Sequence, residues 1–179
     1  FRSVEYKALG EVGAFRRGHG LQKKDLVESG IGCIHYGEIH TYYRLAAYET
    51  KSYVDPSLSR HLCKASPGDL VIATTSEDDR DVCKAVAWLG QEEIAVGGDA
   101  CVYSHSLDSK YVSYFFQSEG FQQQKRALIT GAKVRRVSPD ALTRVRIPIP
   151  PLDVQHEIVR ILDTFSTLEA ELEAELEAE

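Results

Sequence analysis

Apolar residues recur at helical spacing over residues 152–179. This stretch holds no Gly or Pro, so nothing interrupts a helix there. The apolar steps of three and four residues predict one helix face that pairs with another helix, as in a coiled coil. The step from Leu172 to Leu176 is one residue longer than alternating steps of three and four require, so the apolar face, or seam, shifts around the helix at its end. The seam residues are Ile158, Ile161, Leu162, Phe165, Leu168, Leu172 and Leu176.

A proline-rich segment leads directly into this predicted helix. Pro148, Pro150 and Pro151 each fix φ at about −65° and disfavour helix at the preceding residue. The chain must therefore run extended up to Leu152 and become helical at once. We interpret residues 146–162, RIPIPPLDVQHEIVRIL, as a rigid joint between an extended segment and a helix.

Short β-like runs separated by turn residues fill most of the preceding chain. Their β-branched and aromatic content predicts strands, and the SPGD tetrapeptide at 66–69 predicts a turn before the second of them. A helix is expected from residue 109 to about 129, where apolar side chains bracket a polar QQQ run and Gly120 weakens the helix slightly. The four strand runs are residues 32–39, 69–74, 82–89 and 94–103.

These elements predict an α+β, or mixed α/β, body with an irregular sheet, because no βαβ alternation indicates a doubly wound fold. A chain of 179 residues with 43% hydrophobic content can build one sizeable core. We therefore expect one globular domain over residues 1–147, followed by the joint and a long coiled-coil-type helix over residues 148–179.

Charge is divided unevenly at the joint. The whole chain carries a formal net charge of −6. Residues 151–179 contain nine acids and one base, which leaves 18 acids and 20 bases in residues 1–150. A body near neutrality still binds nucleic acid where its bases cluster, because phosphate attraction depends on local patches. The candidate clusters are Arg16, Arg17, Lys23 and Lys24, and then Lys125, Arg126, Lys133, Arg135 and Arg136.

Signals for catalysis, metal binding and membrane insertion are weak. The four cysteines are thirty, twenty and eighteen residues apart, so we expect reduced, partly buried thiols rather than a zinc site or a disulfide framework. The acidic residues at 78–81 lack the glycine and spacing of a calcium loop. The GGD run at 97–99 is more typical of a bulge or turn than of a dinucleotide site. With no leader, membrane-length apolar run or lipidation signal, we expect a cytoplasmic, non-catalytic protein without cofactor, metal or membrane partner.

Several segments together resemble the specificity (S) subunit of type I restriction-modification enzymes. The joint carries the resemblance through its IPxPPL pattern, Gln155 in a D-x-Q setting, and the IVxxLD helix that follows. The target recognition domain of the same subunits is similar to residues 9–12, 17–18, 34–37, 67–76 (PGDLVIATTS) and 129–142 (ITGAKVRRVSPDAL). With the joint, the resemblance covers essentially the whole chain.

The resemblance implies a non-catalytic DNA reader. Each recognition domain of the family binds one half of a split double-stranded target. The helices act as a spacer that docks methyltransferase (M) subunits and, through them, restriction (R) subunits. A full subunit has two recognition domains and two helical regions, whereas this chain has one of each. The native protein is either a half-subunit or part of a longer chain, and the sequence leaves both open. Two alternative functions also stay open: a structural coiled-coil adaptor, and the specificity domain of a fused restriction-methyltransferase enzyme.

Direct reading of DNA requires side chains that reach base edges or phosphates. The polar loop at 75–80 offers such groups, although it could equally be a plain hairpin loop. The mixed aromatic and polar run at 35–43 also offers them, although one of its histidines could be structural instead. Lys133 and Arg135 follow a TGA turn that projects them, so they are the preferred contacts. The predicted DNA contacts are Arg17, His19, Lys23, Tyr36, His40, Tyr42, Thr75, Ser76, Glu77, Arg80, Lys133 and Arg135.

The predicted helix has the length of a spacer. At 1.5 Å per residue it would span roughly 42 Å, somewhat more than the ~34 Å of one turn of DNA. Our hypothesis is that two such helices pair antiparallel, so that a homodimer reads an inverted, split sequence. The glutamates from residue 169 onward repel one another, which favours either a basic partner surface or a frayed end.

Overall fold

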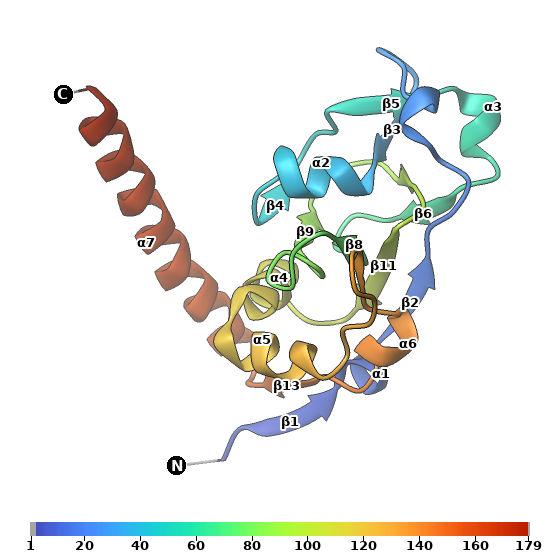
Figure 1. The fold of residues 1–179 in the computed structure, drawn as a ribbon. Coiled ribbons are helices and arrows are strands. Elements are labelled where there is room, and N and C mark those ends of the chain that lie inside the picture. The colour runs from blue at the N-terminus through green and yellow to red at the C-terminus, as the bar shows by residue number, and fades with distance from the viewer. Residues whose placement is uncertain (1–2, 179) are drawn as a thin grey trace.

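The computed structural model describes residues 3–178, and a five-stranded sheet lies at its centre (Figure 1). Neighbouring strands are antiparallel except for the last two, which are parallel. In order across the sheet the strands are β2 (Gly13–Arg17), β11 (Ala100–His105), β7 (Leu70–Ala73), β9 (Ala85–Trp88) and β4 (Ala46–Ala47).

Strand β7 is buried on both faces. Leu70 and Ile72 pack into one core, and Val71 and Ala73 pack into a second core on the opposite face. A strand covered on both sides needs apolar residues at every position, not at alternate ones. This requirement explains why residues 70–73, within the strand predicted at 69–74, are all apolar. The predicted turn before it is also present, because the amide of Asp69 donates to the carbonyl of Ser66 at 3.0 Å.

A second sheet covers one face of the central sheet. Its strands are β5 (Ser52–Val54), β3 (Ile31–Ile34), β10 (Ile94–Val96) and β6 (Cys63–Ala65), in that order. Ile34, Ile94 and Val96 from this sheet share a core with Trp88 and Val102 of the central sheet. Short helices α3 (Pro56–Ser59) and η1 (Lys23–Asp25) complete this part of the body.

Helices cover the opposite face. The helices α4 (Ser109–Gln117) and α5 (Glu119–Arg126) contribute Phe115, Phe116 and Phe121 to the larger core. Leu9 of α1 (Leu9–Val12) and Leu142 of α6 (Pro139–Leu142) close the same core from the side. The fold is therefore mixed α+β with irregular sheets, as predicted.

The single helix predicted for residues 109–129 is wrong in one respect, because Ser118 divides it. Ser118 has an extended backbone (φ −72°, ψ 152°). Its hydroxyl donates to the Phe115 carbonyl at 2.7 Å and accepts from the Phe121 amide at 3.2 Å. One serine thus ends α4 and caps the start of α5, since serine hydroxyls compete well for free backbone groups at helix ends.

The strand predicted for residues 32–39 is wrong beyond Ile34. Residues Tyr36–Thr41 form helix α2 instead. The Glu38 carboxylate accepts from the His35 amide at 3.1 Å, and the His35 Nδ1 accepts from the Gly37 amide at 3.2 Å. This reciprocal capping satisfies donors that a strand would have left to a neighbour.

Two further strand predictions change in extent. The run at 82–89 begins as a strand only at Ala85, because Cys83 has a positive φ of 70°. The run at 94–103 is not one strand but two, β10 and β11, which lie in different sheets. The GGD segment turns the chain between them, in agreement with its interpretation as a turn.

The proline joint forms as predicted. Strand β13 (Arg146–Ile149) pairs antiparallel with β1 (Glu5–Ala8), so the two ends of the body are tied together. Helix α7 (Leu152–Ala178) starts after Pro151, whose carbonyl accepts from the Gln155 amide at 3.0 Å. Figure 1 shows α7 extending away from the body as a rod.

Gln155 fixes the direction of this rod. Its side chain is 2% exposed. The amide nitrogen donates to the Pro150 carbonyl at 2.8 Å, and the amide oxygen accepts from the Asp108 backbone amide at 3.0 Å. One buried side chain therefore links the joint, the start of α7 and the N-terminus of α4.

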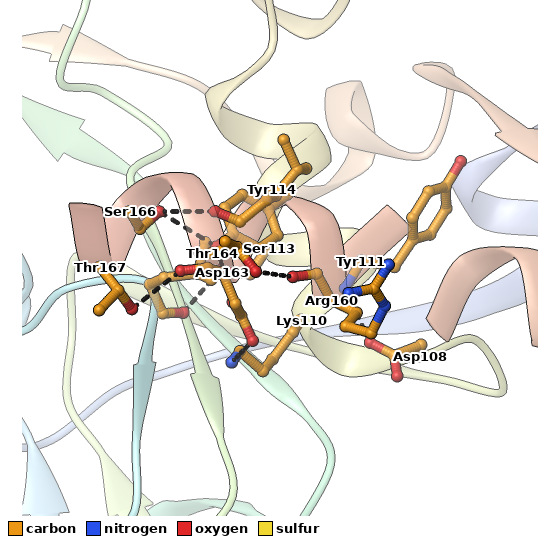
Figure 2. A network of polar contacts seen from close by, with 12 residues as sticks. Asp108, Lys110, Tyr111, Ser113, Tyr114, Arg160, Asp163, Thr164, Ser166 and Thr167 are labelled. Carbon is orange, nitrogen blue, oxygen red and sulfur yellow. Dashed lines mark hydrogen bonds and ion pairs between the residues drawn. The ribbon is translucent and has the colours of Figure 1, made fainter. Parts of the chain in front are cut away.

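A polar network extends the contact between α4 and α7 (Figure 2). Asp163 accepts from the Lys110 ammonium at 2.5 Å and from the Tyr114 hydroxyl at 2.7 Å. Burial alone would raise the pKa of Asp163, but these hydrogen bonds outweigh it and lower the pKa. Val159 is buried against the body on the same side of α7. The first half of α7 is thus attached by both apolar and charged contacts.

We predict that Gln155→Ala destabilises the fold, because it leaves the buried Pro150 carbonyl and the partly buried Asp108 amide without their partner. The expected loss is about 1–3 kcal/mol in the free energy of unfolding. Urea unfolding followed by circular dichroism measures it. Gln123→Ala, at an exposed position of α5, is the matched control. Equal losses in the two variants would contradict the proposed role of Gln155.

Candidate nucleic-acid interface

Two loops that were predicted separately as DNA-contacting pair with each other. The chain beyond β7 continues as β8 (Thr75–Ser76), and β8 pairs antiparallel with β12 (Arg135–Arg136). Thr130 and Arg136 also exchange backbone hydrogen bonds, both at 2.8 Å, which closes the 130–136 loop. The polar loop at 75–80 and the basic loop at 130–136 therefore form one surface at the end of the central sheet.

Arg135 holds the tip of the basic loop in shape. Its Nη1 donates to the carbonyls of Gly131 (2.7 Å) and Ala132 (2.9 Å), while its Nε is 2.5 Å from the Asp79 carboxylate. Gly131 has φ +92°, a conformation that favours glycine. Because the guanidinium is occupied within the loop, the side chains that project freely from the tip are Lys133 and Val134.

Helix α2 joins this surface through a histidine. The His40 Nε2 lies 2.9 Å from the Thr75 carbonyl oxygen, so Nε2 carries the proton. The ring centroids of Tyr36 and His40 lie 6.3 Å apart, with the two rings in an edge-to-face arrangement. Burial lowers the pKa of neighbouring His35, in keeping with the neutral Nδ1 that caps α2. His40 thus has a structural bond, while Tyr36 is half-buried beside it.

The segment after β2 is fixed against the turn at 97–99. The Gly18 amide donates to the Ala100 carbonyl at 2.9 Å. A Cβ atom at Gly18 would lie 1.9 Å from the Gly97 carbonyl oxygen, so only glycine permits this approach. Arg17 is thereby placed at the edge of the same surface, where it is exposed.

Two shallow hollows meet at Asp99. One, of about 310 Å³, is lined by Arg17, Thr75 and Arg136 as well as Asp99. The other, of about 360 Å³, is lined by Lys23, His35 and Tyr36 as well as Asp99. We call these two hollows, the paired strands β8 and β12 with the 130–136 loop, and the adjoining His40 the polar surface. The predicted contacts that it brings together are Arg17, Lys23, Tyr36, His40, Thr75, Ser76, Lys133 and Arg135.

The remaining predicted contacts lie elsewhere or to one side. Glu77 and Arg80 line a third hollow of about 610 Å³, which also borders Arg135. His19 is exposed but lines neither hollow of the polar surface. Tyr42 is 54% exposed at the end of α2, with the Lys51 ammonium 4.7 Å from its ring centre.

Two members of the predicted basic clusters have structural roles instead. Lys125 is 1% exposed and donates to the carbonyls of Arg80 (2.8 Å) and Val82 (2.9 Å). Burial lowers its pKa. Arg16 contacts the Asp69 carboxylate at 3.3 Å and the Ser104 hydroxyl at 3.0 Å. The burial of Lys125 removes it from contact with DNA, so including it in a DNA-binding cluster was wrong. Arg16 lines neither hollow of the polar surface, and its place in the first cluster stays a prediction.

Sequence reasoning missed Asp99 and did not select Arg136. Asp99 Oδ1 accepts from the Thr75 hydroxyl at 2.9 Å and from Arg136 Nη1 at 3.3 Å. The GGD run does signal a turn, but the sequence gives no indication that this turn meets β8 and β12. Only the pairing of distant segments makes Asp99 central.

The cysteines fit the expectation of buried thiols. All four are free, three of them buried and Cys63 half-buried. Burial raises the pKa of Cys33 and of Cys83 to about 12, which keeps both thiols protonated and unreactive. Among residues 3–178, no cluster of three or more His, Cys, Asp or Glu is arranged to hold a metal ion. In the same residues no helix is both long and apolar enough to cross a membrane.

The predicted seam of α7 divides into two parts. Ile158 packs against the core of the body, and Leu162 is half-buried. Beyond the contact with α4 the seam is open. Ile161 is 42% exposed, and the rest of the seam is 55–65% exposed, at Phe165, Leu168, Leu172 and Leu176. Apolar side chains left open in this way are typical of a helix that lacks its partner.

Comparison with known proteins identifies the family of the chain. The chain belongs to the family described as type I restriction modification DNA specificity domain, which matches residues 2–179. It is 26% identical over 172 residues to the specificity subunit of the Escherichia coli type I restriction enzyme EcoR124I/EcoR124II, covering 92% of this chain and 41% of the relative. It is 29% identical over 114 residues to the EcoKI specificity subunit of E. coli K12, covering 63% of this chain and 25% of that subunit.

Solved structures share the fold. The HsdS subunit from Thermoanaerobacter tengcongensis superimposes with a TM-score of 0.67 at 18% identity, covering 97% of this chain and 40% of that one. The type I S subunit from M. genitalium gives a TM-score of 0.58 at 14% identity, and the match covers 97% of this chain and 42% of that subunit. The chain therefore spans less than half the length of these relatives, and the predicted family resemblance is confirmed.

We predict that Arg135→Ala loosens the loop tip without unfolding the protein, because the carbonyls of Gly131 and Ala132 lose their shared donor. Amide hydrogen exchange measured by mass spectrometry should become faster at residues 131–135. Arg126→Ala is the control, since that exposed guanidinium contacts only the Glu119 side chain. Unchanged exchange at the tip of the Arg135 variant would show that the loop holds its shape by other means.

Proposed function

We propose that this chain is a non-catalytic, cytoplasmic specificity element that reads one half of a split double-stranded DNA target. In this proposal residues 1–147 are the recognition unit and residues 148–179 are the joint and spacer. The observation that supports it best is the polar surface, where segments far apart in sequence bring basic and hydrogen-bonding side chains to one end of the central sheet. A coiled-coil adaptor would need α7 but has no use for such a surface.

The side chains of the polar surface have complementary roles. Arg17, Lys23 and Lys133 are exposed cations that suit phosphate contacts, which anchor a protein on the duplex and make binding salt-dependent. Tyr36 and Ser76 are half-buried on the same surface, where their side chains suit stacking on, or hydrogen bonding to, base edges. Arg135 acts by positioning the tip and not by touching DNA itself.

The same proposal gives α7 two duties. Its open seam accepts another helix, and the groove between α7 and the body suits a methyltransferase subunit, through which restriction subunits would be recruited. This groove measures about 1040 Å³. It carries Arg44 and Lys84 on the body and Glu169 and Glu173 on the helix. A partner surface with both charges would therefore be held from two sides.

We predict that binding of a cognate duplex weakens steeply with salt. Lys133→Ala should reduce the slope of log K against log salt by about 1 if Lys133 contacts a phosphate. Fluorescence anisotropy at several salt concentrations measures this, on the complex reconstituted with the neighbouring methyltransferase subunit. Lys7→Ala, on strand β1 and outside both hollows of the polar surface, should leave the slope unchanged. A complex that shows no salt-dependent DNA binding would overturn the proposed function.

The homodimer version of the proposal makes a separate prediction. If two α7 helices pair antiparallel, Phe165→Glu places a charge at the middle of the seam and should convert dimer to monomer in sedimentation velocity at micromolar concentrations. Thr167→Glu is the control, because two residues rotate the side chain by roughly 200°, away from the seam. A wild-type chain that is monomeric at these concentrations would rule out the homodimer and leave a longer chain or another partner helix.

A further inference from the structure

Asp99 occupies an unusual position in the backbone. It lies in the turn between β10 and β11 with φ 57°, in the left-handed region that side chains other than glycine rarely adopt. Its carbonyl accepts from the Thr74 amide at 2.9 Å, directly before β8. A residue remains in this region when its surroundings hold it there, and such residues concentrate at functional sites. The turn is thus fixed to the end of the core strand.

Only one oxygen of the Asp99 carboxylate accepts hydrogen bonds within the protein. Oδ1 accepts from the Thr75 hydroxyl and from Arg136, at 2.9 and 3.3 Å. No residue within 3–178 donates a hydrogen bond to Oδ2, and the side chain is 43% exposed. Thr75 is itself buried at 6% exposure, so its hydroxyl is a firm anchor for Oδ1. One carboxylate oxygen is therefore held, while the other accepts no hydrogen bond from residues 3–178.

The surroundings decide what this free oxygen can accept. Asp99 is the only acid among the residues that line the two hollows of the polar surface, where Arg17, Lys23 and Arg136 are the cations. A carboxylate repels phosphate, so the DNA backbone is disfavoured at this point although it is favoured around it. An ionised carboxylate only accepts hydrogen bonds. In the major groove the donors are the amino groups of cytosine (N4) and adenine (N6), whereas guanine and thymine present acceptors.

We infer that Asp99 is a specificity-determining residue that accepts a hydrogen bond from the exocyclic amino group of a cytosine or an adenine in the recognised half-site. The inference rests on the proposed function and deepens it, because it assigns one position of the target to one side chain. Guanine or thymine at that position would place an acceptor against the carboxylate, so the residue selects by repulsion as well as by attraction.

The test is selection of bound duplexes from a randomised double-stranded DNA library, with the complex reconstituted from this chain and its methyltransferase subunit. Wild-type protein is compared with Asp99→Asn and Asp99→Gly. Both replacements tolerate the left-handed backbone, and asparagine keeps an acceptor for the Thr75 hydroxyl. Asp153→Asn, exposed in the first turn of α7, is the matched control for loss of one negative charge.

Wild-type protein should show one position restricted to cytosine or to adenine, and sequencing tells the two apart. Asp99→Gly should relax that position by on the order of tenfold and leave the others unchanged. Asp99→Asn should alter the same position alone, toward adenine, with which an amide pairs through both N6 and N7. Identical motifs in all four proteins would overturn the inference, as would uniform weakening at every position, which indicates a structural role. If wild-type protein enriches no motif, the proposed function itself fails.

Discussion

Burial of strand β7 on both faces determines where the functional surface lies. Leu70 to Ala73 are enclosed by two cores, so the strand cannot shift its register without exposing apolar residues. Thr74, Thr75 and Ser76 continue directly from it and become the first polar positions at the end of the sheet. The loop at 130–136, the turn at 97–99 and helix α2 all bond to these three residues or to their immediate partners. A rigid core strand thus ends in the surface that we propose reads DNA.

The joint transmits the same rigidity to α7. Because β13 pairs with β1 and Gln155 bonds across three elements, the helix leaves the body in one direction. The network around Asp163 then holds the first half of α7 against α4, while the second half projects with its apolar seam open. A body fixed to a rod suits the proposed function, in which two DNA half-sites lie at a set distance.

The parts of the fold that depend on local sequence were predictable. Prolines 148, 150 and 151 define the joint, and the uninterrupted three–four spacing defines α7. The run at 69–74 was predictable as a strand from its β-branched residues Val71, Ile72 and Thr74. Predictions went wrong where a single polar side chain overrides the local pattern. Ser118 divides the helix at 109–129, and the Glu38 carboxylate converts part of a β-like run into α2.

The candidate site was only half predictable for a similar reason. Polar loops at 75–80 and 130–136 stand out by composition, but their pairing is a long-range contact that no local pattern encodes. That pairing changes the assignments of individual residues. Arg135 holds the tip of the 130–136 loop by hydrogen bonds, Lys125 is buried, and Asp99 lies at the centre of the polar surface. Composition identified the loops, and only the fold separates supporting side chains from exposed ones.

The most direct test of the account is methylation mapping. The neighbouring methyltransferase subunit would be incubated with a genomic DNA library, with and without this chain, and methylated adenines located by sequencing. The account predicts a split motif that is methylated only when the chain is present. Methylation that is the same with and without the chain would contradict its central claim, that this fold supplies the sequence specificity.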